Sequence, residues 1–243
     1  RQGLIRGPEL RVGGCRRPVG PAQGHVVTVR SMVCILAAGQ GTRISAFGGR
    51  LHKALLPLGE MPVLTRIIGA FPATSEFVVA LGHESEQVRG YLALAHPEVS
   101  IRFIDIDPYA GPGSGPGRSL LACREAVDGP FVLTACDAIC TLPIPRPDFN
   151  WMGVQYVDDP AGWCTLTVDD GRVSALHYRD PDGPHQAFVG VAGIHDASLF
   201  FEGLERSLSE SGEIQVNGGF EALLDRGITT VEVGWLDTGM DDT

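Results

Sequence analysis

The sequence predicts an α/β protein in three layers, with helices on both faces of a mixed, mostly parallel sheet and a small antiparallel region. Through the first half of the chain, short apolar runs alternate with segments of helical periodicity. This alternation is typical of parallel strands joined by helices. In the second half, strand-like runs follow one another with only turns between them, as in antiparallel sheets. The 243 residues can bury a full core within one domain.

The first half supplies the expected parallel strands and their connecting helices. Pro62 fits the first turn of a helix, and apolar residues at helical spacing give the second helix a face made of Val88, Tyr91, Leu92 and Ala95. A stretch rich in glycine and proline at 111–117 is predicted to be a loop. The expected strands are 32–37, 76–81, 99–105 and 131–135, and the expected helices are 62–71, 84–95 and 119–127.

The second half supplies the expected antiparallel region. Three runs, 152–157, 164–168 and 172–178, are predicted to form a meander with a hairpin turn at 169–171. The remaining expected elements are strands at 189–195 and 229–233 and helices at 197–208 and 219–225. Because no repeat and no interdomain linker is evident, residues 31–243 are predicted to form a single domain.

Residues 1–30 are rich in arginine, glycine and proline and have no clear apolar period. They resemble neither a secretory signal nor a regular element. The prediction is a disordered leader or a segment added upstream of a natural start near Met32.

The charge distribution excludes some partners. Residues 1–30 hold six arginines and one glutamate, a charge of +5, so the total of −10 leaves −15 on residues 31–243. A body this acidic is a poor binder of nucleic acid or membranes. No run is long enough for a membrane span, and the six cysteines lack zinc-site spacing and are expected to be reduced. The sequence therefore predicts a soluble, cytoplasmic protein.

A single lysine, Lys53, stands against eighteen arginines and follows the glycine turn Gly39-Gln-Gly-Thr-Arg43. Lysine presents a compact ammonium that fits between phosphate oxygens, whereas arginine presents a broad planar fork. A strand that ends in a glycine turn also directs backbone N–H groups at phosphates. The dinucleotide pattern G-x-G-x-x-G fails at Ile44, and the G-x-x-x-x-G-K-[ST] phosphate loop is absent. A different polyphosphate site is the remaining hypothesis.

The stretch Leu36-Ala-Ala-Gly-Gln-Gly-Thr-Arg43, followed by Lys53-Ala-Leu-Leu-Pro57, resembles the signature of the sugar-phosphate nucleotidyltransferase family. The resemblance spans about residues 32–239 and implies a Rossmann-like, GT-A-like nucleotidyltransferase fold. Cys136 stands where the family usually has glycine. Further similar segments follow in the family's order: 78–91, Leu133–Asp137, Val191–His195 and Trp235–Gly239.

The resemblance implies the reaction NTP + X-phosphate → NDP-X + pyrophosphate. Arg43 would hold the β- and γ-phosphates, Lys53 the α-phosphate region, and Asp137 and Asp237 a Mg²⁺ ion. As alternatives, Asp137 could cap the next segment and Asp237 could lie in a turn. Because a phosphate oxygen is already ionised near neutral pH, the attacking group requires no general base.

The nucleotide itself is expected at the glycine-rich segments. The residues assigned to nucleotide binding are Leu36, Ala37, Ala38, Gly39, Gly41 and Thr42, together with Gly115 and Gly117. A plain surface loop is the rival interpretation of 111–117. His83 and His177 receive no role, because histidines in loops and strands are usually structural.

The acceptor is expected beside Tyr178 and Arg179. Hexose-1-phosphate members carry a Glu-Lys-Pro motif here, so the sugar-binding carboxylate is absent while a cation is kept. This difference favours a small non-hexose acceptor that carries a phosphate or phosphonate. The stretch 113–121 resembles small cytidylyltransferases of capsule or phosphonate pathways, of the phosphocholine or phosphoglutamine type. The leading hypothesis is therefore a Mg²⁺-dependent cytidylyltransferase that uses CTP.

Two alternatives stay open. The first is a thymidylyl-, uridylyl- or guanylyltransferase that acts on a sugar 1-phosphate. The second is an inactive nucleotide-binding homologue, against which the presence of Arg43, Lys53, Asp137 and Asp237 argues. A homodimer is compatible with the sequence under each hypothesis.

Overall fold

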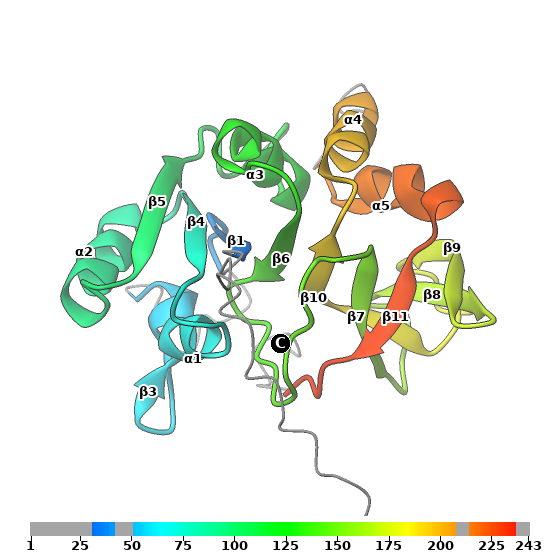
Figure 1. Cartoon of the computed structure of the whole chain (residues 1–243), viewed down its shortest axis with the longest axis horizontal. Coiled ribbons are helices and arrows are strands. Elements are labelled where there is room, and N and C mark those ends of the chain that lie inside the picture. The colour runs from blue at the N-terminus through cyan, green and yellow to red at the C-terminus, as the bar shows by residue number, and fades with distance from the viewer. Residues whose placement is uncertain (1–30, 42–50, 208–213, 237–243) are drawn as a thin grey trace, which may run out of the picture.

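The strands of the computed structural model form a mixed sheet that runs through the whole molecule, with helices on both of its faces (Figure 1). The structure describes residues 31–41, 51–207 and 214–236. Within these residues the main sheet has nine strands in the order β5-β4-β1-β6-β10-β7-β11-β9-β8. Their bounds are β1 Met32–Ala37, β4 Glu76–Leu81, β5 Ser100–Asp105, β6 Phe131–Ala135, β7 Trp151–Tyr156, β8 Cys164–Asp169, β9 Arg172–Tyr178, β10 Gln186–Ile194 and β11 Thr229–Glu232.

The first four strands of that order are parallel, and β1 lies at their centre. Met32 is in register with Glu76 of β4 on one side and with Phe131 of β6 on the other. The carboxyl ends of β1 and β6 therefore reach the same edge of the sheet. In open α/β sheets, ligands bind outside this edge.

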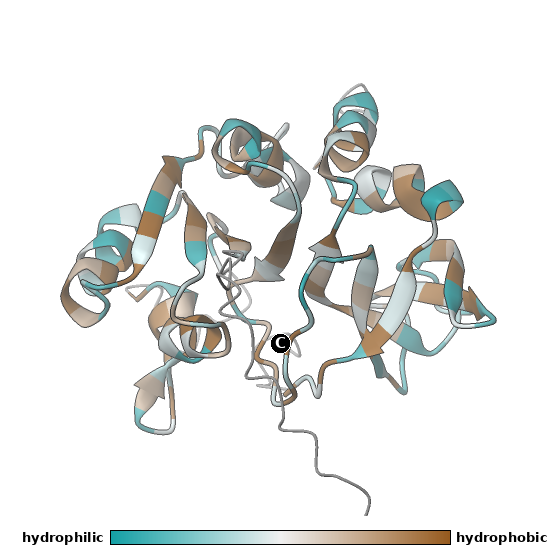
Figure 2. Cartoon of the chain, viewed as in Figure 1, coloured by the Kyte–Doolittle hydropathy of each residue, from teal (hydrophilic) through white to brown (hydrophobic). Residues whose placement is uncertain are grey.

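Side chains of β1 alternate between two hydrophobic clusters. Val33, Ile35 and Ala37 pack with α1 (Val63–Gly69) and α2 (Ser85–Ala95), whereas Cys34 packs with α3 (Pro116–Ala122). The helices α4 (Ala197–Ser207) and α5 (Asn217–Leu223) extend the second layer, which Figure 1 shows along one side of the sheet. Figure 2 shows apolar residues gathered in the strands and in α1, while α2 and α4 carry both kinds. The predicted three-layer α/β fold is confirmed.

Two elements near the glycine-rich stretches differ from the sequence prediction. The helix expected from Ser119 begins at Pro116, within the predicted loop, and gives way to a 3-10 turn at Arg124–Ala126. Proline suits the first helical position because its fixed φ is already helical and its missing N–H has no partner there. A 3-10 turn at Lys53–Leu55 and a small hairpin of β2 (Pro57–Leu58) and β3 (Met61–Pro62) were not predicted.

The predicted three-stranded meander is wrong. β8 and β9 do form a hairpin, but β7 lies between β10, which is antiparallel to it, and β11, which is parallel. A single register pair joins β10 to β8, Ala187 with Thr165, and another joins β11 to β9. β7, β10, β8, β9 and β11 are thereby linked into a ring, in which no strand pairs only with its sequence neighbours.

Other differences are small. Val88 and Leu92 of the α2 face are buried and Tyr91 is half-buried, but Ala95, the last residue of α2, is exposed. None of the helices in the described part of the chain is long and apolar enough to cross a membrane.

A close backbone approach fixes α3 against the segment that begins at Ile214. The Gly117 amide donates to the Ile214 carbonyl at 2.8 Å, and a Cβ at Gly117 would lie 2.4 Å from the Gln215 carbonyl oxygen. Gln215 also lines the cleft described below. This contact explains why residue 117 is glycine without reference to a ligand.

We expect Gly117→Ala to lower the free energy of unfolding by about 1–3 kcal/mol, because the backbone must move to make room. Gly90→Ala is the matched control, because a Cβ there meets nothing within 4 Å and the exposed site lies inside α2. Alanine at that site should stabilise the protein by about 0.5–1 kcal/mol. Urea unfolding of both variants tests the pair, and a Gly117→Ala variant as stable as the parent would show that the close approach of residues 117 and 215 does not require glycine.

Candidate active site

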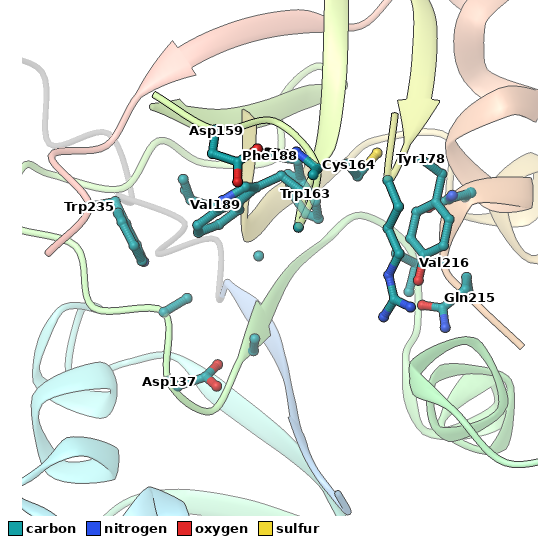
Figure 3. Close-up of a pocket in the computed structure, with 17 residues that line it drawn as sticks. Asp137, Asp159, Trp163, Cys164, Tyr178, Phe188, Val189, Gln215, Val216 and Trp235 are labelled. Atoms are coloured by element: carbon teal, nitrogen blue, oxygen red, sulfur yellow. Dashed lines mark hydrogen bonds between the residues drawn. The ribbon is translucent and has the colours of Figure 1, made fainter. Parts of the chain in front are cut away.

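A cleft of about 720 Å³ lies beyond the end of β6, against the antiparallel half of the sheet (Figure 3). Its lining includes Asp137, Trp163, Tyr178, Arg179, Gln215 and Trp235. Three residues that the sequence assigned to the site, Asp137, Tyr178 and Arg179, thus line one cleft, although they come from distant parts of the chain.

Asp137 follows the end of β6. The next strand, β1, holds this position, because the Cys136 amide donates to the Leu36 carbonyl at 3.3 Å. The Asp137 side chain is only 15% exposed, so its carboxylate sits at the cleft with little access to bulk water. An ionised group in this position requires a cationic partner.

Lys53 is that partner. Its Nζ donates to Asp137 Oδ2 at 2.6 Å, and its side chain is 23% exposed. The two residues lie 84 positions apart in the sequence. A hydrogen bond between two ionised groups is short and about twice as strong as one between neutral groups. The fold therefore places the chain's one lysine on the carboxylate that the sequence assigned to metal binding.

The glycine turn lies beside Lys53. Gly41 has a φ of +60°, and a Cβ there would approach the Lys53 side-chain carbons at 3.3 Å. Leu36 and Ala37 end β1, Ala38 follows it, and Gly39 is exposed, so that a Cβ added there would meet nothing within 4 Å. Thr42 and Arg43, which the sequence also assigned to this turn, lie outside the described residues.

A histidine that the sequence analysis passed over joins these segments. His52 is 1% exposed, its Nε2 lies 3.0 Å from the Ala37 carbonyl oxygen, and its Nδ1 accepts from the Ala54 amide at 3.2 Å. Its own amide donates to Gln87 Oε1 at 3.0 Å. Burial lowers the pKa of His52 to about 4, although the bond to the Ala37 carbonyl opposes this shift. The ring is therefore neutral at neutral pH, with its proton on Nε2.

The predicted acceptor residues lie at the end of β9. Arg179 adopts a left-handed backbone with a φ of +51°, and its amide donates to the Trp163 carbonyl at 2.9 Å. Its guanidinium carbon lies 5.3 Å from the centre of the Tyr178 ring. A non-glycine residue in this conformation costs about 1 kcal/mol or more, and such strain clusters at functional sites.

The cleft also contains residues that the sequence analysis did not predict. Trp163 and Trp235 meet edge to face, with ring centres 5.4 Å apart. Asp159, on the loop between β7 and β8, accepts from the Ala161 amide at 2.9 Å through Oδ1. Cys164 lines the same wall, and burial raises the pKa of its thiol to about 11, so it is no nucleophile at neutral pH. Asp159, Trp163 and Cys164 lie in a turn-rich segment and match no motif, so the sequence carries no signal for them.

The other predicted residues stand apart from this cleft or outside the described chain. Gly115 and Gly117 open α3, and neither lines the cleft. Asp237 lies outside the described residues, one position beyond Leu236. Within the described residues there is no group of three or more histidine, cysteine or acidic side chains that could hold a metal.

Comparison with known proteins identifies a family for this chain. The model of the MobA-like NTP transferase domain matches residues 33–187, which is more than half of the chain. The chain is 25% identical over 196 residues to the bifunctional protein GlmU of Methanococcus aeolicus, a match that spans 78% of this chain and 46% of that protein. It therefore spans about half the length of the curated relative.

Solved structures share the fold at low identity. A UDP-glucose pyrophosphorylase complexed with UDP-glucose has a TM-score of 0.69 at 15% identity, over 85% of this chain and 92% of that one. The inositol-1-phosphate CTP transferase from T. maritima has a TM-score of 0.68 at 16% identity, over 88% and 94%. The matched family, with the fold that these structures share, shows that the chain belongs to the MobA-like NTP transferase domain family and is thus a nucleotidyltransferase.

Proposed function

We propose that the protein transfers a cytidylyl group from CTP to a small, non-hexose acceptor that carries a phosphate or phosphonate, with release of pyrophosphate. The observation that carries this proposal is the Lys53–Asp137 pair, joined at 2.6 Å beside a cleft that Arg179 also lines. Arg179 and Asp137 line the cleft and Lys53 pairs with Asp137, and two cations beside a carboxylate suit a reaction between two phosphorylated groups.

In the proposed reaction an oxygen of the acceptor's phosphoryl group attacks the α-phosphorus of the nucleotide. The bond between that phosphorus and the oxygen bridging to the β-phosphate breaks, and pyrophosphate leaves with the bonding electrons. The attacking oxygen is ionised near neutral pH, so no proton has to be removed. The described lining of the cleft contains no histidine, and Cys164 is protonated.

Lys53 and Asp137 would compensate opposite charges: Lys53 the negative charge of the phosphates and Asp137 the positive charge of the metal ion. The ammonium of Lys53 would stabilise the negative charge that develops around the α-phosphate, where a compact cation fits between oxygens. Asp137 would hold Mg²⁺ together with the nucleotide phosphates, since this ion is usually bound by one or two carboxylates and substrate oxygens. Bound Mg²⁺ supplies charge neutralisation and alignment of the phosphates. Two described carboxylates, Asp137 and Asp159, line the cleft, and one carboxylate with the nucleotide phosphates would suffice for such a site.

In this scheme the pair would separate when substrates bind. Asp137 would hold the metal ion and Lys53 would contact the phosphates, so each charge would exchange one partner for another. The ion pair therefore keeps both groups in place and compensated before the nucleotide arrives. Arg43 and Asp237 complete the proposed set for the β- and γ-phosphates and for the metal, as the sequence resemblance implies.

The acceptor is proposed to bind at Tyr178 and Arg179. The guanidinium of Arg179 suits bidentate binding of a phosphoryl group. Tyr178 offers one hydroxyl and an apolar ring, and it cannot chelate two vicinal hydroxyls as a carboxylate does. Support for CTP comes from the resemblance of residues 113–121 to small cytidylyltransferases, and a fold neighbour is itself named as a CTP transferase.

A second candidate is a thymidylyl-, uridylyl- or guanylyltransferase for a sugar 1-phosphate, and Asp159 favours it. This carboxylate lines the same cleft from a different loop and could take hydroxyl groups in place of the missing glutamate. Tryptophan rings such as Trp163 also pack well against a sugar. The named activity of UDP-glucose pyrophosphorylase belongs to that class.

Pyrophosphate release separates the two candidates. The protein is assayed with CTP, UTP, dTTP and GTP, each with glucose 1-phosphate, N-acetylglucosamine 1-phosphate, phosphocholine, inositol 1-phosphate and a simple phosphonate. CTP with a non-hexose acceptor should give the highest kcat/KM. Efficient synthesis of UDP- or dTDP-glucose would instead establish the second candidate, and in that case Asp159→Ala should abolish it.

Lys53→Arg should lower kcat by about 100-fold or more, because a delocalised fork cannot replace a point charge between phosphates. Circular dichroism should show an unchanged fold. Arg124→Lys is the matched control, since Arg124 pairs with Glu205 on the surface. Near-normal turnover of Lys53→Arg would contradict the assignment of Lys53.

Asp137→Asn should reduce Mg²⁺-dependent turnover by about 100-fold or more, because the proposed metal ligand loses its charge. The same change frees Lys53 from its 2.6 Å ion pair, so the affinity for nucleotide in EDTA should be kept or increased. Isothermal titration with and without Mg²⁺ measures both effects. A variant that turns over normally would show that Asp137 is structural.

Arg179→Ala should raise the KM for the acceptor by about 10- to 100-fold, the cost of a lost hydrogen bond to a charged group. The KM for the nucleotide should change little. Arg146→Ala removes a surface arginine that is paired with Asp148, and it serves as the control. Equal increases in both KM values would place Arg179 elsewhere than on the acceptor.

A further inference from the structure

We propose that His52 is a positioning residue that sets the place of Lys53 through the carboxyl end of β1. The proposal rests on the function proposed above, in which Lys53 acts on the phosphates. His52 does not line the cleft and touches no substrate in this scheme. It acts by fixing the backbone from which the lysine side chain extends.

The need for such a residue follows from the flexibility of lysine. A lysine side chain has four rotatable bonds, and catalysis requires its ammonium to be held within a fraction of an ångström. Lys53 begins a 3-10 turn of only three residues, Lys53–Leu55, and so has no long helix to fix it. The contacts around this short turn must supply the rigidity.

His52 supplies these contacts in three directions. Its Nε2–H donates to the Ala37 carbonyl at 3.0 Å, and its Nδ1 caps the turn by accepting from the Ala54 amide at 3.2 Å. Its own amide donates to Gln87 Oε1 on α2 at 3.0 Å. Since Ala37 O can only accept and Ala54 N can only donate, the neutral Nε2–H tautomer satisfies both nitrogens. The residue is 1% exposed, so every polar atom of the ring is used within the protein.

Because His52 binds Ala37, the segments that carry Lys53 and Asp137 are both hydrogen-bonded to the carboxyl end of β1. The Leu36 carbonyl accepts from Cys136, the neighbour of Asp137, and the next carbonyl, that of Ala37, binds His52, the neighbour of Lys53. The Lys53–Asp137 distance is therefore governed by two consecutive carbonyls of β1. Loss of the hydrogen bond between His52 and Ala37 should therefore let the Lys53 side chain change position while Asp137 stays in place.

Two substitutions separate the two ring contacts. His52→Asn keeps an oxygen that can cap the Ala54 amide but is too short to reach Ala37. His52→Gln extends its amide about as far as the imidazole Nε2 and can still donate to Ala37, while it loses the cap. We expect His52→Asn to lower kcat by about 10- to 100-fold with little change in the KM for the acceptor. His52→Gln should recover most of this loss.

The single lysine makes a direct readout possible. Protein labelled with lysine carrying ¹⁵N at Nζ contains one such side chain, that of Lys53. In His52→Asn its resonance should move toward the position found in Asp137→Asn, in which the Asp137 carboxylate is absent. In His52→Gln it should stay near the parent position. His195→Asn, a change to an exposed histidine at the end of β10, is the matched control and should leave the resonance unmoved.

A double-mutant cycle tests whether His52 acts through Lys53. The affinity for Mg²⁺-nucleotide is measured for His52→Asn in the parent and in Lys53→Ala. A positioning role predicts a loss in the parent and little further loss in Lys53→Ala. Equal losses in both backgrounds, or an unchanged lysine resonance in a folded His52→Asn, would overturn the proposal.

The proposal stays testable if His52→Asn does not fold or if the protein turns over no substrate pair. If His52→Asn does not fold, Gln87→Met removes the contact to the His52 amide from α2, and it must move the lysine resonance in the same direction or the proposal fails. If no nucleotide and acceptor pair turns over, the proposed function fails, but the resonance still decides whether His52 positions Lys53.

Discussion

The carboxyl end of β1 is the constraint on which the rest of the site depends. Three successive carbonyls, those of Leu36, Ala37 and Ala38, bind the segments that contain Cys136, His52 and His83, at 3.3, 3.0 and 3.0 Å. A buried strand between two parallel neighbours has its position fixed by both ladders. Its last carbonyls are therefore fixed acceptors to which the following loops hydrogen-bond. Two of these loops carry Lys53 and Asp137, which meet in an ion pair.

This arrangement explains how a salt bridge could serve at the proposed catalytic site. The two side chains are mostly removed from water, so breaking the pair without replacement would leave a poorly solvated charge. In the proposed function, a metal-bound nucleotide would bring a cation for Asp137 and anionic oxygens for Lys53 in one event. Each of the two charges would thus have an opposite charge beside it both before and after binding. The free-energy cost of opening the ion pair would therefore be low.

The strands could be predicted from the sequence where burial alone determines them. β1, β4, β6 and β9 have the predicted bounds, because each is an apolar or alternating run closed by turn residues. The partners of β7 could not be predicted, since pairing with β10 and β11 is decided by long-range packing. The start of α3 was missed because proline and glycine indicate a loop locally, although proline at a first helical position is favourable.

For the site too, the sequence predicts residues that have a local signal and does not predict those whose role depends on long-range contacts. Lys53 stood out by composition and Asp137 by its motif, and the structure joins them. His52 had no such signal, because its role depends on burial and on three partners that are separated from it by up to 35 residues. A histidine that directly precedes the one lysine was the only available hint. Where a flexible side chain carries the chemistry, the residue next to it is therefore a place to look for the group that holds it still.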